Sequence, residues 1–186
     1  EETERILRGC DRNTVMGKRD YAVLLLLARL GLRAGEIVHM NLDDIGWETG
    51  EILVRGKSSR EERLPLPHDV GEALAAYLRH GRPRCSSRRV FIRMDAPRQG
   101  FSGSSTVCVI VRRALSQAGI NPGFKGAHLF RHTLATTMLR GGASFSEIGE
   151  ILRHQHPSTT EIYAKVDLSG LRSIAQSWPG GVACMK

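Results

Sequence analysis

The chain has 186 residues, enough for one buried core, because a single domain typically has about 100 to 200 residues. Hydrophobic residues make up 41% and charged residues 25% of the sequence, which is ordinary for a globular protein and excludes a disordered chain. The formal net charge of +8 favours a polyanionic partner such as nucleic acid, although a solvated basic surface explains the charge equally well.

The first half of the chain shows helix and strand patterns in turn. A dense Leu and Ala pattern without a breaker predicts a buried helix that ends near Gly31. Short apolar runs predict strands, and the polar residues 56–60 between two of them indicate a hairpin loop. The predicted helices cover residues 19–30, 35–42 and 69–80, and the predicted strands cover residues 51–55, 62–66 and 90–92.

The second half of the chain is predicted to be helical. Gly119 ends one helix, and the pair Gly141-Gly142 separates the next two. The predicted helices cover residues 104–118, 128–140, 144–153 and 157–165, and apolar residues at helical spacing continue over residues 168–178. The predicted fold class is therefore mainly α with a small three-stranded antiparallel sheet (α+β).

Six residues stand out as candidates for chemistry. Taken alone, each has an ordinary structural explanation. Arg33 suits a helix C-terminus, Lys57 suits a solvated hairpin, and Tyr163 suits a half-buried core aromatic residue. The six candidates are Arg33, Lys57, His128, Arg131, His154 and Tyr163.

The sequence around these candidates resembles the motifs of the integrase-type tyrosine recombinases. Leu-Gly-Leu-Arg-Ala-Gly-Glu at residues 30–36 resembles the first arginine motif of that family, and residues 56–66 resemble its lysine hairpin. His-Leu-Phe-Arg-His-Thr at residues 128–133 matches its His-x-x-Arg helix. Residues 152–154 and 158–163 resemble its final histidine and its nucleophile. Four motifs in this order imply the integrase-type catalytic domain of DNA breaking-rejoining enzymes.

The resemblance implies a chemical role for four of the candidates. Tyr163 attacks a DNA phosphodiester and becomes linked to the 3′-phosphate, so religation needs no ATP. Arg33 and Arg131 clamp the scissile phosphate, because guanidinium groups bind phosphate oxygens bidentately and stay charged. Lys57 protonates the departing 5′ oxygen.

Three more residues support this chemistry. By resemblance, His128 hydrogen-bonds the phosphate and assists proton transfer, and His154 donates a further hydrogen bond to the phosphate. Glu36 follows Arg33 by three residues and would orient its guanidinium group. A helix-surface acid explains Glu36 almost as well.

The resemblance implies no metal or cofactor. His128 and His132 lie one helical turn apart, and His154 and His156 follow, so a zinc cluster is an alternative interpretation. The segment lacks the glutamate of a His-Glu-x-x-His motif, however, and the recombinase role already accounts for His128 and His154.

Two positions depart from the family pattern. Arg153 stands where glycine is most common, directly before the histidine, and Ser58 stands where glycine is common in the lysine hairpin. A side chain at position 153 would alter the turn into His154 or add a phosphate contact. The basic segment 82–89 would follow the DNA backbone, but a solvated loop is the safer interpretation.

We expect one catalytic domain over residues 1–178 and a flexible C-terminal tail over residues 179–186. Members of the family usually carry an N-terminal DNA-binding domain, which we expect to be absent from this chain. Double-stranded DNA is the expected partner, bound by a homotetramer whose C-terminal segments pack between protomers. Packing of residues 168–178 against their own domain fits their spacing equally well.

The sequence also predicts a cytoplasmic, nucleoid-associated location. The longest apolar run, residues 21–28, is much shorter than the roughly 20 residues of a membrane span, and the charged N-terminal residues do not resemble a signal peptide. The cysteines form no Cys-x-x-Cys pair, which favours a reduced protein.

The predicted function is that of a site-specific DNA recombinase, or integrase, such as those of mobile elements. Two alternatives remain open. An enzyme similar to type IB topoisomerases would relax DNA without site specificity. A non-catalytic regulator on the same fold would bind DNA without forming a covalent adduct.

Overall fold

The structure is a computed structural model, and it describes residues 2–56, 61–122 and 126–153. The chain divides into two compact units, residues 1–134 and residues 135–186. The predictions made for residues 154–186, which include two helices and the tail, lie outside the described residues.

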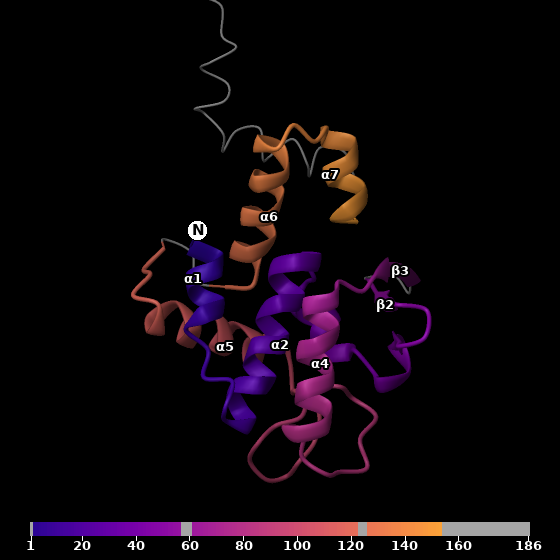
Figure 1. Cartoon of the computed structure of the whole chain (residues 1–186). Helices are drawn as coiled ribbons and strands as arrows, with labels where there is room; N and C mark the ends of the chain where they lie inside the picture. Colours follow the sequence, from indigo (N-terminus) through magenta and orange to yellow (C-terminus); the bar gives the residue numbers. More distant parts are fainter. Residues whose placement is uncertain (1, 57–60, 123–125, 154–186) are drawn as a thin grey trace, which may run out of the picture. The chain divides into compact units, whose positions relative to one another are not determined.

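The secondary structure of the first unit is dominated by helices, with one small sheet (Figure 1). The helices described there are α1 (Glu2–Arg8), α2 (Val15–Leu30), α3 (Ala34–His39), the short 3-10 helix η1 (Leu42–Asp44), α4 (His68–His80), α5 (Ser104–Gln117) and the beginning of α6 (His128–Arg140). The strands are β1 (Ile45–Gly46), β2 (Glu51–Arg55) and β3 (Glu61–Pro65).

Helix α2 forms the centre of the first unit. Residues 22–27 are fully buried, and the helix packs against α4, α1, α3 and α5 (Figure 1). A helix that is apolar on every side is stable only when neighbours cover all its faces. The predicted buried helix is therefore confirmed, but it begins earlier, at Val15. Thr14 caps that end, because its hydroxyl oxygen accepts the Gly17 N–H at 3.0 Å.

The three strands form one antiparallel sheet in the order β1-β2-β3. Ile45 of β1 pairs with Ile52 of β2, and Arg55 at the end of β2 pairs with Glu61 at the start of β3. Ile52 and Val54 are buried while their neighbours in β2 are more exposed, which is the alternation expected of a sheet with one covered face. The sheet confirms the predicted α+β fold class.

The prediction of a third strand at residues 90–92 is wrong, because β1 takes that place. Residues 90–92 are buried, but Ile92 makes only an isolated bridge to Gly100. The Ile92 N–H donates to the Tyr77 hydroxyl oxygen at 3.1 Å, so a side chain satisfies it. A short apolar run does not distinguish a strand from a buried loop segment.

The second unit, where the structure describes it, contains the end of α6 and helix α7 (Phe145–Ile151). Ser144 and Glu147 cap the start of α7. The Glu147 N–H donates to the Ser144 hydroxyl at 3.3 Å, and the Ser144 N–H donates to the Glu147 carboxylate at 2.7 Å. The Ser144 hydroxyl also donates to the Glu147 carboxylate at 2.7 Å, and this bond, together with that from the Ser144 N–H, lowers the pKa of Glu147.

Arg153 follows α7 with a φ of 55°, in the left-handed region that favours glycine. The arginine at this position, noted above as a departure from the family pattern, therefore occupies a conformation that L side chains rarely adopt. A search of the described residues finds no helix with the length and hydropathy of a membrane span.

Candidate active site

Arg33 lies in the tight turn between α2 and α3. Gly31 ends α2 in the left-handed conformation, with a φ of 56°, and both its N–H and that of Leu32 donate back to the Leu26 carbonyl. Leu32 is buried, which anchors the turn. Arg33 then occupies the position directly before the first residue of α3. The arginine is thus placed by a backbone turn that glycine makes easy.

Glu36 holds Arg33 at two points. One carboxylate oxygen accepts the Arg33 backbone N–H at 2.7 Å, and the other contacts the Arg33 guanidinium at 2.8 Å. The Glu36 side chain is only 4% exposed, whereas that of Arg33 is 34% exposed. A buried carboxylate therefore orients a guanidinium group that solvent can still reach.

Arg131 comes from α6, one hundred residues after Gly31 in the sequence. Its Nη1 donates to the Gly31 carbonyl oxygen at 2.6 Å, and the residue is only 4% exposed. A buried guanidinium is costly unless it is hydrogen-bonded, so this contact fixes the side chain. The structure thereby brings Arg131 to the same turn that carries Arg33.

His128 and His132 lie on α6, on either side of Arg131, and both are exposed. Partial burial of the imidazole, the neighbouring His128 and the charge of Arg131 lower the pKa of His132, in that order of importance. His128 and Arg131 are three residues apart and share one face of α6.

Lys57, His154 and Tyr163 lie outside the described residues. Their placement relative to Arg33 and Arg131 therefore stays a prediction. The strands that flank Lys57 in the sequence are described. Arg55 and Glu61, the last pair of the β2-β3 ladder, also form an ion pair at 3.0 Å.

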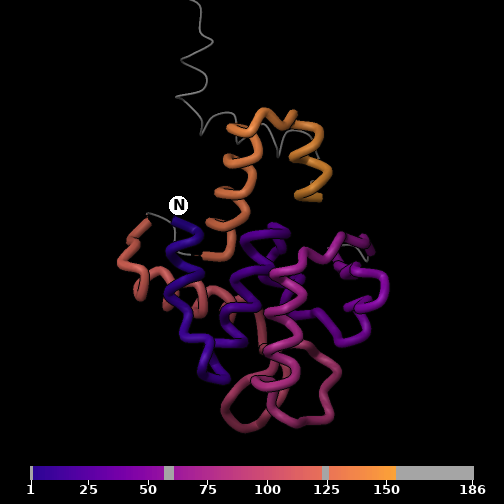
Figure 2. Tube along the Cα trace, in the orientation of Figure 1, coloured from indigo at the N-terminus to yellow at the C-terminus, as the bar shows by residue number. Residues whose placement is uncertain are grey.

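The basic segment 82–89 is folded against its own neighbourhood. It belongs to the connection of residues 81–103, which loops beyond the end of α4 before returning to α5 (Figure 2). The Arg82 guanidinium donates to the carbonyl oxygens of Ser87 at 2.6 Å and Arg89 at 2.8 Å. Arg88 pairs with Asp43. Arg82 therefore organises the segment, while Arg88 stays exposed, so whether the segment follows DNA or is only solvated stays a prediction.

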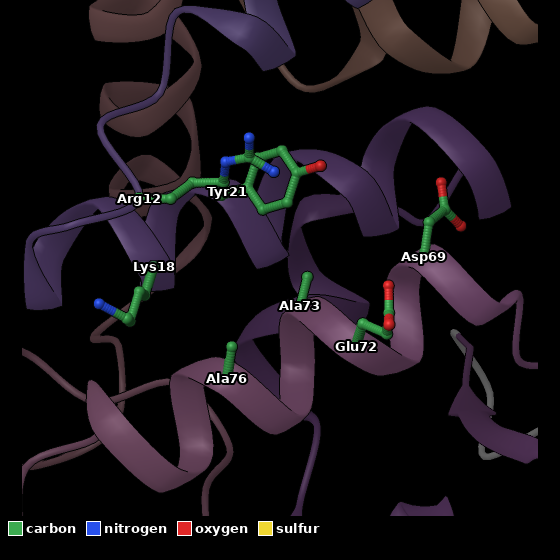
Figure 3. Close-up of a pocket in the computed structure, with 7 residues that line it drawn as sticks. All are labelled: Arg12, Lys18, Tyr21, Asp69, Glu72, Ala73 and Ala76. Carbon is green, nitrogen blue, oxygen red and sulfur yellow. The ribbon is translucent and has the colours of Figure 1, made fainter.

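A pocket lies apart from these residues, between α4 and the start of α2 (Figure 3). Cationic side chains stand on one side of it and carboxylates on the other, with small alanines between them. The Arg12 guanidinium lies 5.0 Å from the centre of the Tyr21 ring. The lining residues are Arg12, Lys18, Tyr21, Asp69, Glu72, Ala73 and Ala76.

The zinc alternative gains no support from the part of the chain that the structure describes. No three histidine, cysteine or acidic side chains there lie close enough to hold a metal ion. His154 and His156, which the alternative requires, are outside that part.

Comparison with known proteins points to one family. The sequence pattern of the phage integrase family matches residues 1–169. The putative integrase/recombinase y4rA of Sinorhizobium fredii is 58% identical over 180 residues, which are 97% of this chain and 44% of that protein. The putative integrase/recombinase y4gC of the same organism is 43% identical over 90% of this chain and 86% of that protein. The tyrosine recombinase XerD of Mycobacterium tuberculosis is 35% identical over 87% of this chain and 51% of that protein.

Solved structures agree with the sequence comparison. The crystal structure of XerA recombinase matches with a TM-score of 0.77 and 28% identity, over 92% of this chain and 61% of that one. XerH bound to its palindromic difH substrate matches with a TM-score of 0.78 and 22% identity, over 93% of this chain and 50% of that one, which supports the fold alone. This chain spans less than half the length of y4rA. The predicted integrase-type fold is confirmed, and the chain belongs to the phage integrase family.

Proposed function

We propose that this chain is the catalytic domain of a site-specific DNA recombinase, which cleaves and rejoins double-stranded DNA through a covalent 3′-phosphotyrosyl intermediate. One observation carries the proposal. Arg131, far from Arg33 in the sequence, donates a hydrogen bond to the Gly31 carbonyl in the turn that carries Arg33, and Glu36 holds the Arg33 guanidinium. Membership of the phage integrase family and the recombinase names of the relatives support it.

The two arginines suit a phosphodiester whose charge grows during cleavage. Fixed guanidinium donors stabilise such charge without reorganising during the reaction, and each preorganised donor can contribute about 3 kcal/mol. Glu36 keeps the Arg33 guanidinium in place, and the Gly31 carbonyl does the same for Arg131. His128 lies on the same helix as Arg131 and is proposed to bind the phosphate and assist proton transfer.

Tyr163 is the proposed nucleophile. Its phenolic oxygen forms a bond to phosphorus while the bond from phosphorus to the 5′ oxygen breaks. Lys57 supplies a proton to that departing oxygen, and His154 donates a hydrogen bond to the phosphate. The new phosphodiester keeps the energy of the old one, so the reverse attack by a 5′ hydroxyl reseals DNA without a cofactor.

The proposal includes the domain bounds, the DNA substrate, the assembly and the location of the protein. The catalytic domain covers residues 1–178 and a tail covers residues 179–186. Double-stranded DNA is the substrate, and XerH and the lambda integrase are described in complexes with DNA sites. A homotetramer with C-terminal segments packed between protomers would bring two DNA sites together, and a nucleoid-associated cytoplasmic location would suit it.

Covalent capture tests the proposal. The chain is incubated with a library of nicked duplexes of random sequence, in which a short fragment diffuses away after cleavage and prevents resealing. The wild type is expected to give an adduct on a denaturing gel, and Tyr163→Phe is expected to give none because it lacks the attacking oxygen. Tyr21→Phe, a tyrosine of the separate pocket, serves as the matched control and should keep the adduct.

The outcomes separate the alternatives. An adduct with Tyr163→Phe would remove this residue as the nucleophile. DNA binding by the wild type without any adduct would favour the non-catalytic regulator. Sequencing of the captured DNA should give a common site, and adducts without sequence preference would favour the topoisomerase-like enzyme.

A further inference from the structure

Asp44 is a buried carboxylate whose two oxygens are both used. It is the last residue of η1 and is only 4% exposed. One oxygen accepts the Asn41 backbone N–H at 2.7 Å, and the other accepts a hydrogen bond from the Arg55 guanidinium. A buried charge is costly without such partners, so both contacts hold firmly.

Arg55 connects three elements through one guanidinium group. Besides its contact to Asp44 in η1, its Nε donates to the Glu61 carboxylate at 3.0 Å. Arg55 is the last residue of β2 and Glu61 the first of β3, and the two are paired in the ladder. The guanidinium therefore joins η1 to both strands at the end where they stop pairing.

This end of the ladder matters because of what the sequence places there. Residues 56–60 connect Arg55 to Glu61, and Lys57 is the second residue after Arg55. We call the contacts of Arg55 with Asp44 and Glu61 the brace. In the sequence, η1 follows α3 after residues 40–41, and α3 begins directly after Arg33. The brace thus ties the ends of the lysine connection to η1, the element that follows α3 in the sequence.

We infer that Arg55 is a positioning residue for DNA cleavage, which acts through Asp44 and Glu61 to hold the strand ends on either side of Lys57. The inference rests on the proposed function, in which Lys57 protonates the departing 5′ oxygen. Proton transfer requires donor and acceptor within hydrogen-bond distance, and a displacement of about 1 Å can cost about 100-fold in rate. Arg55 itself needs no contact with DNA for this role.

The test compares two leaving groups in single-turnover cleavage with excess protein, on the site captured as described above. One substrate has the ordinary 5′ oxygen at the scissile bond, and the other has a bridging sulfur there. The thiolate leaves without a proton, because a thiol is much more acidic than an alcohol. Lys57→Ala should be slow on the oxygen substrate and close to the wild type on the sulfur substrate.

Arg55→Ala should follow the same pattern. We expect its rate to fall about tenfold or more on the oxygen substrate and to recover to within about threefold of the wild type on the sulfur substrate. Arg63→Ala is the matched control, because Arg63 forms an exposed ion pair with Glu51 in the same two strands, at 3.5 Å. It should resemble the wild type on both substrates.

The results distinguish the two proposals. Failure of the wild type to cleave, or of Lys57→Ala to recover on sulfur, would remove the proposed function or its lysine assignment. If Lys57→Ala recovers but Arg55→Ala is equally slow on both substrates, or is never slow, the inference about Arg55 alone fails. If Arg55→Ala does not fold, Glu61→Gln tests the inference instead, because this variant keeps the buried contact between Arg55 and Asp44. Its cleavage rate should fall less on the oxygen substrate and should return to the wild-type rate on the sulfur substrate. An equal loss on both substrates would contradict the inference.

Discussion

Two sets of arginines in the first unit differ in how the sequence brings them together. The segment 82–89 is dense in arginine, yet Arg82 bonds carbonyls within its own loop and Arg88 pairs with Asp43. Arg33 and Arg131 stand alone in the sequence, yet they meet at one turn. Under the proposed function, the pair that comes together from distant parts of the sequence binds the phosphate, and the locally dense segment does not.

The largest effect on DNA cleavage is expected for Arg131→Lys. Lysine keeps the charge but loses the planar fork, so it cannot bind the Gly31 carbonyl and a phosphate with the same geometry. We expect single-turnover cleavage to fall by at least about 100-fold. Arg88→Lys, at an exposed ion pair of the dense segment, should cleave at the wild-type rate. Equal losses for both variants would contradict the distinction between the two regions.

A smaller effect is expected at the carboxylate that orients Arg33. Glu36→Gln keeps the size of the side chain but removes its charge, which weakens its hold on the guanidinium and the backbone N–H. The cleavage rate should fall about tenfold. Glu48→Gln, at an exposed turn residue, is the control and should leave the rate unchanged. A wild-type rate for Glu36→Gln would show that Arg33 does not depend on this contact.

The smallest effect on cleavage is expected for substitutions in the arginine-rich segment 82–89. Arg82→Ala removes hydrogen bonds to several carbonyl oxygens and should lower the free energy of unfolding by about 2 kcal/mol, measured by urea denaturation. Folded Arg82→Ala should cleave DNA like the wild type. Arg84→Ala, at an exposed neighbour, should change neither quantity. If Arg82→Ala is stable but cleaves DNA slowly, the segment 82–89 contacts DNA after all.

Strong local patterns made much of the fold predictable. The predicted helix at residues 128–140 has the bounds of α6, and that at residues 69–80 differs from α4 by one residue, because periodic apolar faces and helix ends are local signals. Helix α1 was not predicted. It has seven residues, of which Ile6 and Leu7 are buried, and so short a segment has no clear period. The strand at residues 90–92 failed because burial, not pairing, explains its apolar residues.

The resemblance to the family pointed to Arg33, Glu36, His128 and Arg131 as candidates, and their roles stay predictions. Of the contacts among them, only that between Arg33 and Glu36, three residues apart, could be expected from the sequence. The bond from Arg131 to Gly31 and the brace of Asp44 with Arg55 join distant segments, so no local pattern shows them. The placement of Lys57, His154 and Tyr163, which lie outside the described residues, stays a prediction from the sequence.

The bond between Arg131 and the Gly31 carbonyl has a consequence for the newly made chain. During synthesis, residue 31 emerges long before residue 131, so the nascent polypeptide holds half of the arginine pair and lacks the other half. Contacts between such distant residues form late, because a long loop must close first. Under the proposed function, a partly folded or prematurely terminated chain lacks one of the two arginines that cleavage requires, so competence to cut DNA arrives only with the completed fold.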